Sequence, residues 1–185
     1  TVVVNELPLI TLSANPDTLC AGDLTTLTAD GASSYAWPVT GNGPTISVSP
    51  GMTTTYTVTG TDNNGCSNTA SVTVVVNDLP VASAGTNQLI PYSTSTTLSG
   101  SATGGSGSYS YAWSPAAMLV NANVQNPSTI VLTSSQVYSL VVTDLVTGCV
   151  SAPVNVTVNV SGAPLAISAS ANPDALCLGG STQLE

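Results

Sequence analysis

The 185-residue chain contains no lysine, arginine, histidine or phenylalanine, and its nine acidic residues give it a formal charge of −9. Binding to nucleic acid depends on Lys and Arg contacts to phosphate, and a polybasic membrane patch needs the same side chains. The composition therefore excludes both kinds of partner. Without His and Lys the chain also lacks the commonest general bases, the usual metal ligand and the amine of Schiff-base catalysis, so we do not expect an enzyme.

Long apolar runs are absent as well. The longest, such as residues 72–76, are far shorter than the roughly 18–20 residues that a membrane-spanning helix needs, so no membrane insertion is expected. No basic segment followed by an apolar stretch marks a signal peptide. Thr, Ser and Val dominate the composition, whereas the helix formers Glu, Lys, Arg and Gln are scarce or missing. This bias favours strands and predicts an all-β protein.

The chain repeats itself. The segment 15–22, Asn-Pro-Asp-Thr-Leu-Cys-Ala-Gly, returns at 172–179 as Asn-Pro-Asp-Ala-Leu-Cys-Leu-Gly. Between these copies, Ser-Tyr-Ala-Trp at 34–37 recurs at 110–113. Further matches link Thr61-Asp62 and Gly65-Cys66 with Thr143-Asp144 and Gly148-Cys149. Such self-similarity is typical of an array of small domains.

The linkers predict the domain boundaries. Valine-rich segments followed by a short Leu-Pro or Ala-Pro linker occur three times, ending near residues 8, 80 and 164. We therefore expect residues 1–5 to be the last strand of a preceding repeat, residues 6–78 to be repeat one, residues 79–161 repeat two, and residues 162–185 the start of a third repeat. The linkers are short, so the array should be semi-rigid.

Within each repeat, apolar residues alternate with polar ones, as in half-buried strands. Clear examples are Tyr56 and Val58, Ile130 and Leu132, and Tyr138, Leu140 and Val142. Turn residues separate these segments, for instance Gly-Gly-Ser-Gly at 104–107. Six or seven short strands with a Trp near the middle predict a small immunoglobulin-like β-sandwich, present here in tandem.

The motifs at 15–22 and 35–37, together with Thr-Thr-Thr-Tyr-Thr-Val-Thr-Gly-Thr-Asp-Asn-Asn-Gly-Cys at 53–66, resemble the PKD-like and Ig-like repeats of large secreted or surface-attached proteins of Bacteroidetes. Repeat two, with its segment 90–100, resembles a second, PKD-like subtype from the same arrays. The resemblance implies an extracellular or cell-surface stalk, adhesin or filament built from tandem sandwiches and delivered by the type IX route. It implies no active site.

Four cysteines in a secreted β-repeat predict disulfides, and they allow three connectivities. The favoured pair is Cys20 with Cys66, because both belong to repeat one. In a Greek-key sandwich, however, the first and last hairpin turns lie at opposite ends, so this bridge would require a rerouted edge. Cys149 has no partner in its own repeat, since Ile90 stands where Cys20 would be. It either pairs with Cys177 across the junction, or Cys177 pairs downstream; both remain open.

Other candidate sites each have a structural alternative. Asp62, Asn63 and Asn64 carry oxygens that suit calcium, yet the same residues build a tight hairpin turn, so no cofactor is required. The two tryptophans could stack on carbohydrate, but their position on a strand predicts core residues. Segment 17–19 resembles the short O-glycosylation motif of secreted Bacteroidetes proteins, with Thr18 as the acceptor.

These features predict a non-catalytic extracellular structural protein whose partners are other copies of itself or neighbouring repeats. The alternative is a carbohydrate- or calcium-dependent binding module of a larger secreted enzyme, with surface polysaccharide as its partner. A third hypothesis is strand addition, in which the segment 1–4 completes a neighbour's sheet.

Overall fold

A computed structural model describes residues 3–39, 41–162, 171–172, 178 and 183–184. Across these residues it consists of β-strands, and the expectation of an all-β protein is confirmed. The strands of the first sandwich are β1 (Thr11–Asn15), β2 (Thr18–Cys20), β3 (Thr25–Asp30), β4 (Ser34–Ala36), β5 (Thr45–Val48), β6 (Thr54–Thr61) and β7 (Ser67–Asn77). Those of the second are β8 (Val81–Ser83), β9 (Gln88–Pro91), β10 (Ser101–Thr103), β11 (Tyr109–Ser114), β12 (Gln136–Asp144) and β13 (Val154–Ser161).

Three short elements complete the description. A 3-10 helix, η1 (Ala116–Met118), follows β11, and β14 (Ala171–Asn172) pairs with β15 (Gln183–Leu184). The described part of the chain contains no helix of the length and apolarity that crossing a membrane would require.

In each sandwich the first strand is split into two short strands, and each of the two pairs with a different sheet. In the first sandwich β1 pairs antiparallel with β3, whereas β2 pairs parallel with β7, giving sheets β1-β3-β5 and β2-β7-β6-β4. In the second, β8 pairs with β10 and β9 pairs parallel with β13, in the sheet β11-β12-β13-β9. Two facing sheets of short strands around a buried Trp form an immunoglobulin-like β-sandwich.

Period-2 alternation builds the cores. Strand β3 buries Thr25, Leu27 and Ala29 and exposes the residues between them, while β6 buries Tyr56 and Val58. The outward-facing hydroxyls of β6 and β7 bond across the strands, as at Thr55–Thr73, 2.9 Å, and Thr57–Ser71, 2.9 Å. Because one face is apolar and the other hydroxyl-rich, the strands hold their register without any charged pair.

The two tryptophans are core residues, as predicted. Trp37 is 9% exposed and Trp113 is 3% exposed, and each lies in the apolar cluster of its own sandwich. Their indole N–H groups donate to the backbone carbonyls of Gly43, 3.0 Å, and Gln125, 3.3 Å. Neither ring is available as a stacking platform for carbohydrate.

One predicted strand is much reduced. Alternation of Ile130 and Leu132 predicts a strand, but this stretch makes only isolated bridges, Thr94–Leu132, Thr97–Ser128 and Leu119–Thr129. Leu132 is buried, whereas Ile130 is 40% exposed. The 3-10 helix η1 lies beside this stretch, where the Ile130 N–H donates to the Met118 carbonyl, 3.0 Å.

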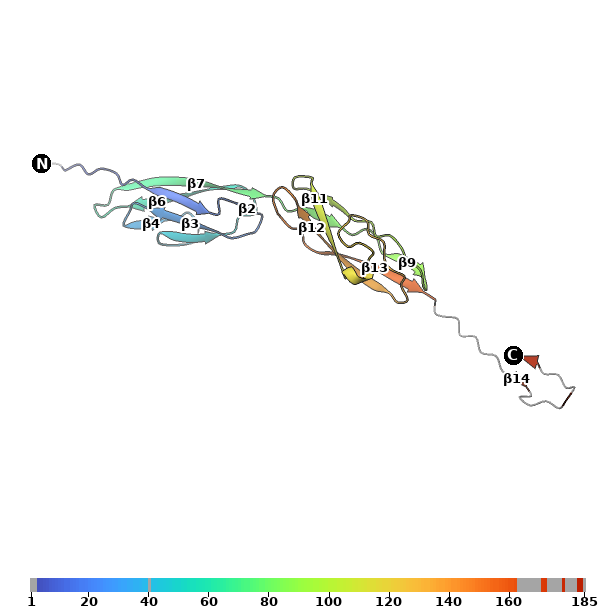
Figure 1. The fold of residues 1–185 in the computed structure, drawn as a ribbon. Helices are drawn as coiled ribbons and strands as arrows, with labels where there is room; N and C mark the ends of the chain where they lie inside the picture. The colour runs from blue at the N-terminus through green and yellow to red at the C-terminus, as the bar shows by residue number, and fades with distance from the viewer. Residues whose placement is uncertain (1–2, 40, 163–170, 173–177, 179–182, 185) are drawn as a thin grey trace.

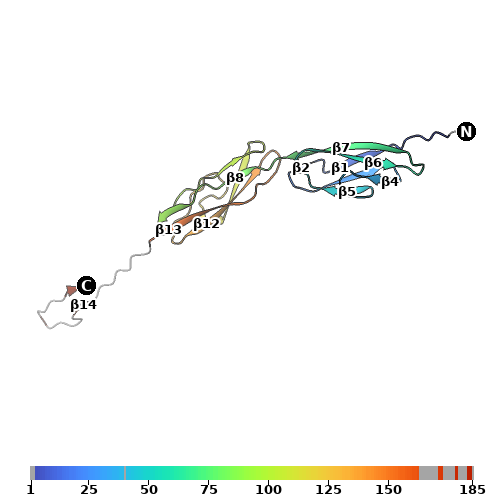
Figure 2. The same ribbon diagram turned by 180° about the vertical axis from the view of Figure 1, so that it is seen from behind.

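The two sandwiches follow one another end to end (Figure 1), and the reverse view shows the same arrangement (Figure 2). Strand β7 runs along the first sandwich to the point where the chain passes into β8. Only residues 78–80 separate these two strands.

The favoured disulfide between Cys20 and Cys66 is wrong. Cys66 immediately precedes β7, whereas Cys20 pairs with Asn77 at the other end of that 11-residue strand. At about 3.3 Å per residue the strand separates the two cysteines by roughly 30–35 Å, against the 4.4–6.8 Å between Cα atoms that a disulfide needs. The hypothesis of a Cys149–Cys177 bridge is also wrong, because Cys149 is bonded to Cys20. Cys177 itself lies outside the described residues.

Candidate functional site at the joint between the sandwiches

A disulfide joins the two sandwiches. Cys20 of the first is bonded to Cys149 of the second, with 5.6 Å between their Cα atoms and 129 positions between them in sequence. We call the region formed by this bond and residues 76–80 the joint. It connects the sandwiches twice, once through the backbone linker and once through the sulfur atoms.

Strand β2 holds the Cys20 side in place. Leu19 points into the first core and is 7% exposed, which anchors the strand beside β7. Directly after Cys20, the Ala21 N–H donates to the Asn77 carbonyl, 2.9 Å, and Gly22, at φ +88°, donates to the Pro50 carbonyl, 3.1 Å. The cysteine is therefore fixed against the last residue of β7, next to the linker.

The hairpin between β12 and β13 holds the Cys149 side. Cys149 is 1% exposed. The Asp144 N–H donates to its carbonyl, 2.8 Å, and the Gly148 N–H donates to the Asp144 carbonyl, 2.9 Å. Two residues after Cys149, the Ser151 N–H donates to the Val142 carbonyl, 2.8 Å, so the bonded cysteine lies within a closed hairpin.

Asp144 is the centre of that hairpin. Its carboxylate is 0% exposed and accepts the backbone N–H groups of Val146, 2.9 Å, and Thr147, 3.1 Å. It also accepts both the N–H and the hydroxyl of Ser106, the hydroxyl at 2.7 Å. With no basic side chain in the chain, these donors supply the compensation that a cation would give elsewhere.

Sequence reasoning missed this role, although one signal could have found it. Alternation along β12 buries Tyr138, Leu140 and Val142, and the next inward position is Asp144. Hydrogen bonds from Ser106 and from the turn hold the pKa of this carboxyl well below its ordinary value. A charged residue at an inward strand position implies dedicated donors, which here tie the 104–107 loop to the Cys149 hairpin.

Acid is expected to weaken the second sandwich through Asp144. Its pKa in the folded chain is lower than in the unfolded chain, about 3.9, so its stabilising contribution is complete above that value. The contribution declines as the pH falls below about 4 and is lost once the pH passes the folded-state pKa. The measurement is the urea midpoint of unfolding at a series of pH values from about 7 to about 2.

D144N is the control for this titration. Its amide cannot accept all four donors, so the variant should be less stable than the natural chain at neutral pH and should lack the acid-dependent component. The stability gap between the two proteins should close toward low pH. Parallel pH profiles for both proteins would contradict the assignment.

Residues of both sandwiches line a hollow of about 330 Å³ at the joint: Val76, Asn77, Asp78, Gly105, Ser106 and Thr147. Gly105 has a φ of +56°, and a side chain there would collide with the Asp144 carboxylate. The loop that faces the end of β7 is therefore restricted to glycine at this position, because the buried carboxylate occupies the space of a Cβ.

The calcium candidates form a hairpin turn. Asp62 Oδ1 accepts the N–H groups of Asn64, 2.8 Å, and Cys66, 2.8 Å, and Gly65 takes a φ of +83°. Among the described residues no three His, Cys, Asp or Glu side chains gather in a group that could hold a metal ion. The turn predicted for Asp62, Asn63 and Asn64 is confirmed, and calcium binding there stays a prediction.

Thr18 and Cys66 complete the set of candidate residues. Thr18 lies exposed on β2, so its hydroxyl is accessible and its glycosylation stays a prediction. Cys66 is a partly buried free thiol in the hairpin before β7. No described residue is its partner.

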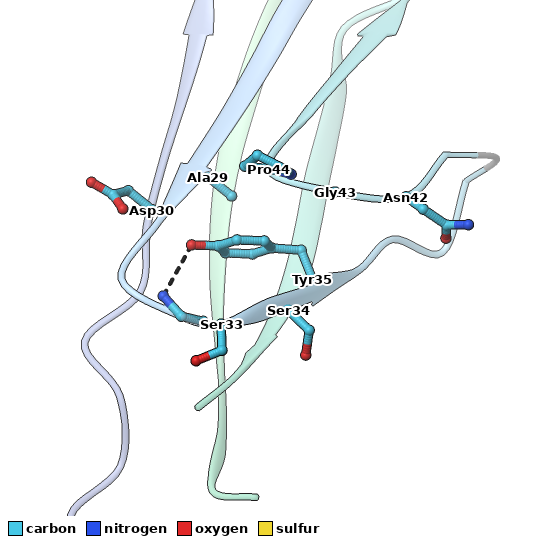
Figure 3. A pocket seen from close by; sticks show the side chains of 9 residues that line it. Ala29, Asp30, Ser33, Ser34, Tyr35, Asn42, Gly43 and Pro44 are labelled. Atoms are coloured by element: carbon cyan, nitrogen blue, oxygen red, sulfur yellow. Dashed lines mark hydrogen bonds between the residues drawn. The ribbon is translucent and has the colours of Figure 1, made fainter. Parts of the chain in front are cut away.

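A second hollow, of about 550 Å³, lies between β3, β4 and the segment 42–44 (Figure 3). Tyr35 extends along it, and its hydroxyl accepts the Ala32 N–H, 2.9 Å. The only charged group lining it is Asp30, whose Oδ1 accepts the Gly31 N–H, 2.8 Å. The Tyr35 hydroxyl and the Asp30 carboxylate are thus both used to hold the 30–35 turn.

No protein-family model and no curated protein matches the chain. Among solved structures, it is similar to a 282-residue C-terminal fragment of intimin in complex with the intimin-binding domain of the translocated intimin receptor, at 13% identity and a TM-score of 0.48, over 90% of this chain and 67% of that one. Murine CEACAM1b is similar at 14% identity and a TM-score of 0.36, over 83% and 100%. The insect immune protein hemolin is similar at 13% identity and a TM-score of 0.38, over 77% and 44%. At these values the similarities carry no argument about function.

Proposed function

We propose that the chain is a non-catalytic extracellular structural module, in which tandem immunoglobulin-like sandwiches serve as a segment of a stalk, adhesin or filament. The observation that carries the proposal is the Cys20–Cys149 bond, which ties the end of one sandwich to the hairpin of the next. Neither cysteine belongs to the core cluster of its sandwich. Its effect is to limit how the two sandwiches move against each other.

Two features support an extracellular or cell-surface setting. Disulfides persist in oxidising compartments and are rare in reducing ones. The outer face of β6 and β7 is built from hydroxyl pairs instead of ion pairs. Such a surface changes little with ionic strength beyond the screening of acidic repulsion, and it offers no Lys or Arg to a trypsin-like protease.

The absence of catalysis is supported by residue chemistry. The chain has no His or Lys to act as a general base, and the buried Asp144 carboxylate is enclosed by four donors within hydrogen-bonding distance. A group in that setting is poorly placed to exchange protons with a substrate. Its partners in this proposal are neighbouring repeats or other copies of the chain.

Small-angle X-ray scattering on the oxidised chain tests the proposal. We expect one elongated shape for the two sandwiches, and a broader distribution of shapes after reduction, because only residues 78–80 then connect them. Equal breadth in both states would contradict a spacer role for the joint. A calcium- or polysaccharide-dependent rise in melting temperature would instead favour the binding-module alternative.

A further inference from the structure

Cys66 lies in the hairpin between β6 and β7 of the first sandwich, at the position that Cys149 holds in the hairpin between β12 and β13 of the second. The Asp62 N–H donates to the Cys66 carbonyl, 3.0 Å, as the Asp144 N–H donates to the Cys149 carbonyl, 2.8 Å. The glycine before each cysteine donates back to the same aspartate, at 3.2 Å and 2.9 Å. Cys149 is bonded to the Cys20 end of another sandwich, whereas Cys66 is a free, partly buried thiol.

The segment that enters each sandwich supplies a second, independent observation. Asn77-Asp78-Leu79-Pro80 enters the second sandwich, and Asn5-Glu6-Leu7-Pro8 enters the first. Cys20 pairs in register with Asn77, so Asn5 marks the corresponding position beside the Cys66 hairpin. The Asn68 side-chain amide donates to the Pro8 carbonyl, 3.0 Å, and holds this segment at the base of the hairpin.

The same segment, which precedes β1 and forms no strand itself, begins with uncovered apolar side chains. Val4 is 88% exposed and Val3 is 79% exposed. Val76, the counterpart of Val4, is instead partly buried against the first core, and Leu19 of β2 pairs with it in the parallel register. Val76 is covered by β2, the strand that ends in Cys20. No described residue covers Val4 in the same manner.

We infer that the Cys66 end of the first sandwich is a docking surface for the Asn-Pro-Asp-x-Leu-Cys end of another domain of the same kind, with Cys66 forming a disulfide to its cysteine. This inference rests on the proposed structural function and names the partner of that function. In this chain the motif occurs at 15–20, where Cys20 is already bonded, and at 172–177, which ends in Cys177. Ile90 replaces the cysteine in the second sandwich, so bridged and unbridged joints would alternate along an array.

The bond forms by thiol–disulfide exchange with a low-molecular-weight disulfide such as oxidised glutathione. The Cys66 thiolate attacks the glutathione disulfide and releases one glutathione, and the thiolate of the incoming cysteine then attacks the mixed disulfide and releases the second. Two protein thiols become one disulfide, and one glutathione disulfide becomes two thiols, so atoms and electrons balance.

The test uses the whole 185-residue chain, mixed from isotopically heavy and light preparations and incubated in a glutathione redox buffer. Digestion before Asp residues releases Cys66 in peptide 62–77 and Cys177 in peptide 174–185. We expect a ladder of multimers on a non-reducing gel, with 62–77 linked to 174–185 in heavy–light combinations. The ladder should disappear in C66S.

C66S/M52C is the matched control, because it restores the number of thiols at a side chain that is 73% exposed and lies at the opposite end of β6 from the hairpin. It should give no ladder with this linkage. Cys66 found only as a glutathione adduct, as a Cys66–Cys66 dimer, or linked to Cys177 of its own molecule would overturn the inference. None of these outcomes affects the scattering test of the joint, so the two proposals fail separately.

Discussion

Reducing the Cys20–Cys149 bond is expected to lengthen the fully stretched chain by about 430–460 Å, because the bond encloses 129 positions and an extended residue spans about 3.3–3.6 Å. In the oxidised protein a pulling force that enters at the N-terminus passes from Cys20 through the sulfur atoms to Cys149. Only the residues outside the closed loop can then extend. The measurement is single-molecule force extension with and without a reductant.

The C20S/C149S variant is the control for this experiment. It should extend to the reduced length under either condition, since it cannot form the bond. Most of both cores lies inside the loop, including Leu27, Val58 and Leu140. A bridge at the joint would thus keep the residues inside the loop from being extended, whereas β1 and β13 lie outside it and stay under load. Equal contour lengths for the natural chain in the two conditions would contradict this load path.

The second large effect concerns Trp113. W113A is expected to destabilise the second sandwich by about 3–5 kcal/mol, the usual cost of removing a large buried aromatic side chain. The ring is 3% exposed, and it lies among Leu140 and other members of the second core. Unfolding in urea, followed by circular dichroism, should show part of the β-signal lost at lower denaturant.

The remaining tryptophan provides the internal control. In W113A the only indole is Trp37, so its fluorescence reports on the first sandwich alone. That transition should stay where it is in the natural chain, because each Trp belongs to a separate core cluster. W37A should give the converse result. A Trp37 transition that shifts together with the circular dichroism signal would show that the two cores unfold as one.

Local pattern predicted most of the fold. Alternation placed Tyr56, Val58, Tyr138 and Leu140 on inward faces, and both tryptophans are core residues. These features depend on neighbours within one strand, which sequence periodicity reports directly. The stretch around Ile130 was wrong in part, because alternation cannot show whether a neighbouring strand lies close enough to complete a ladder.

The joint could not be predicted in the same way. Repeat matching identified Cys66 and Cys149 as equivalent positions, but the pairing depends on the direction and length of β7, which place Cys66 and Cys20 at opposite ends. The role of Asp144 depends on Ser106, which lies 38 positions away. Contacts between distant segments require the topology, and composition and spacing do not contain it.

The most direct test of the disulfide-linked joint is a disulfide map of the natural protein. Trypsin has no cleavage site in a chain without Lys and Arg, whereas cleavage before Asp separates the four cysteines into peptides 17–22, 62–77, 144–173 and 174–185. After free thiols are blocked and the protein is digested without reduction, mass spectrometry should find 17–22 linked to 144–173. A linkage of 17–22 to 62–77 would place the bridge within one sandwich and contradict the account.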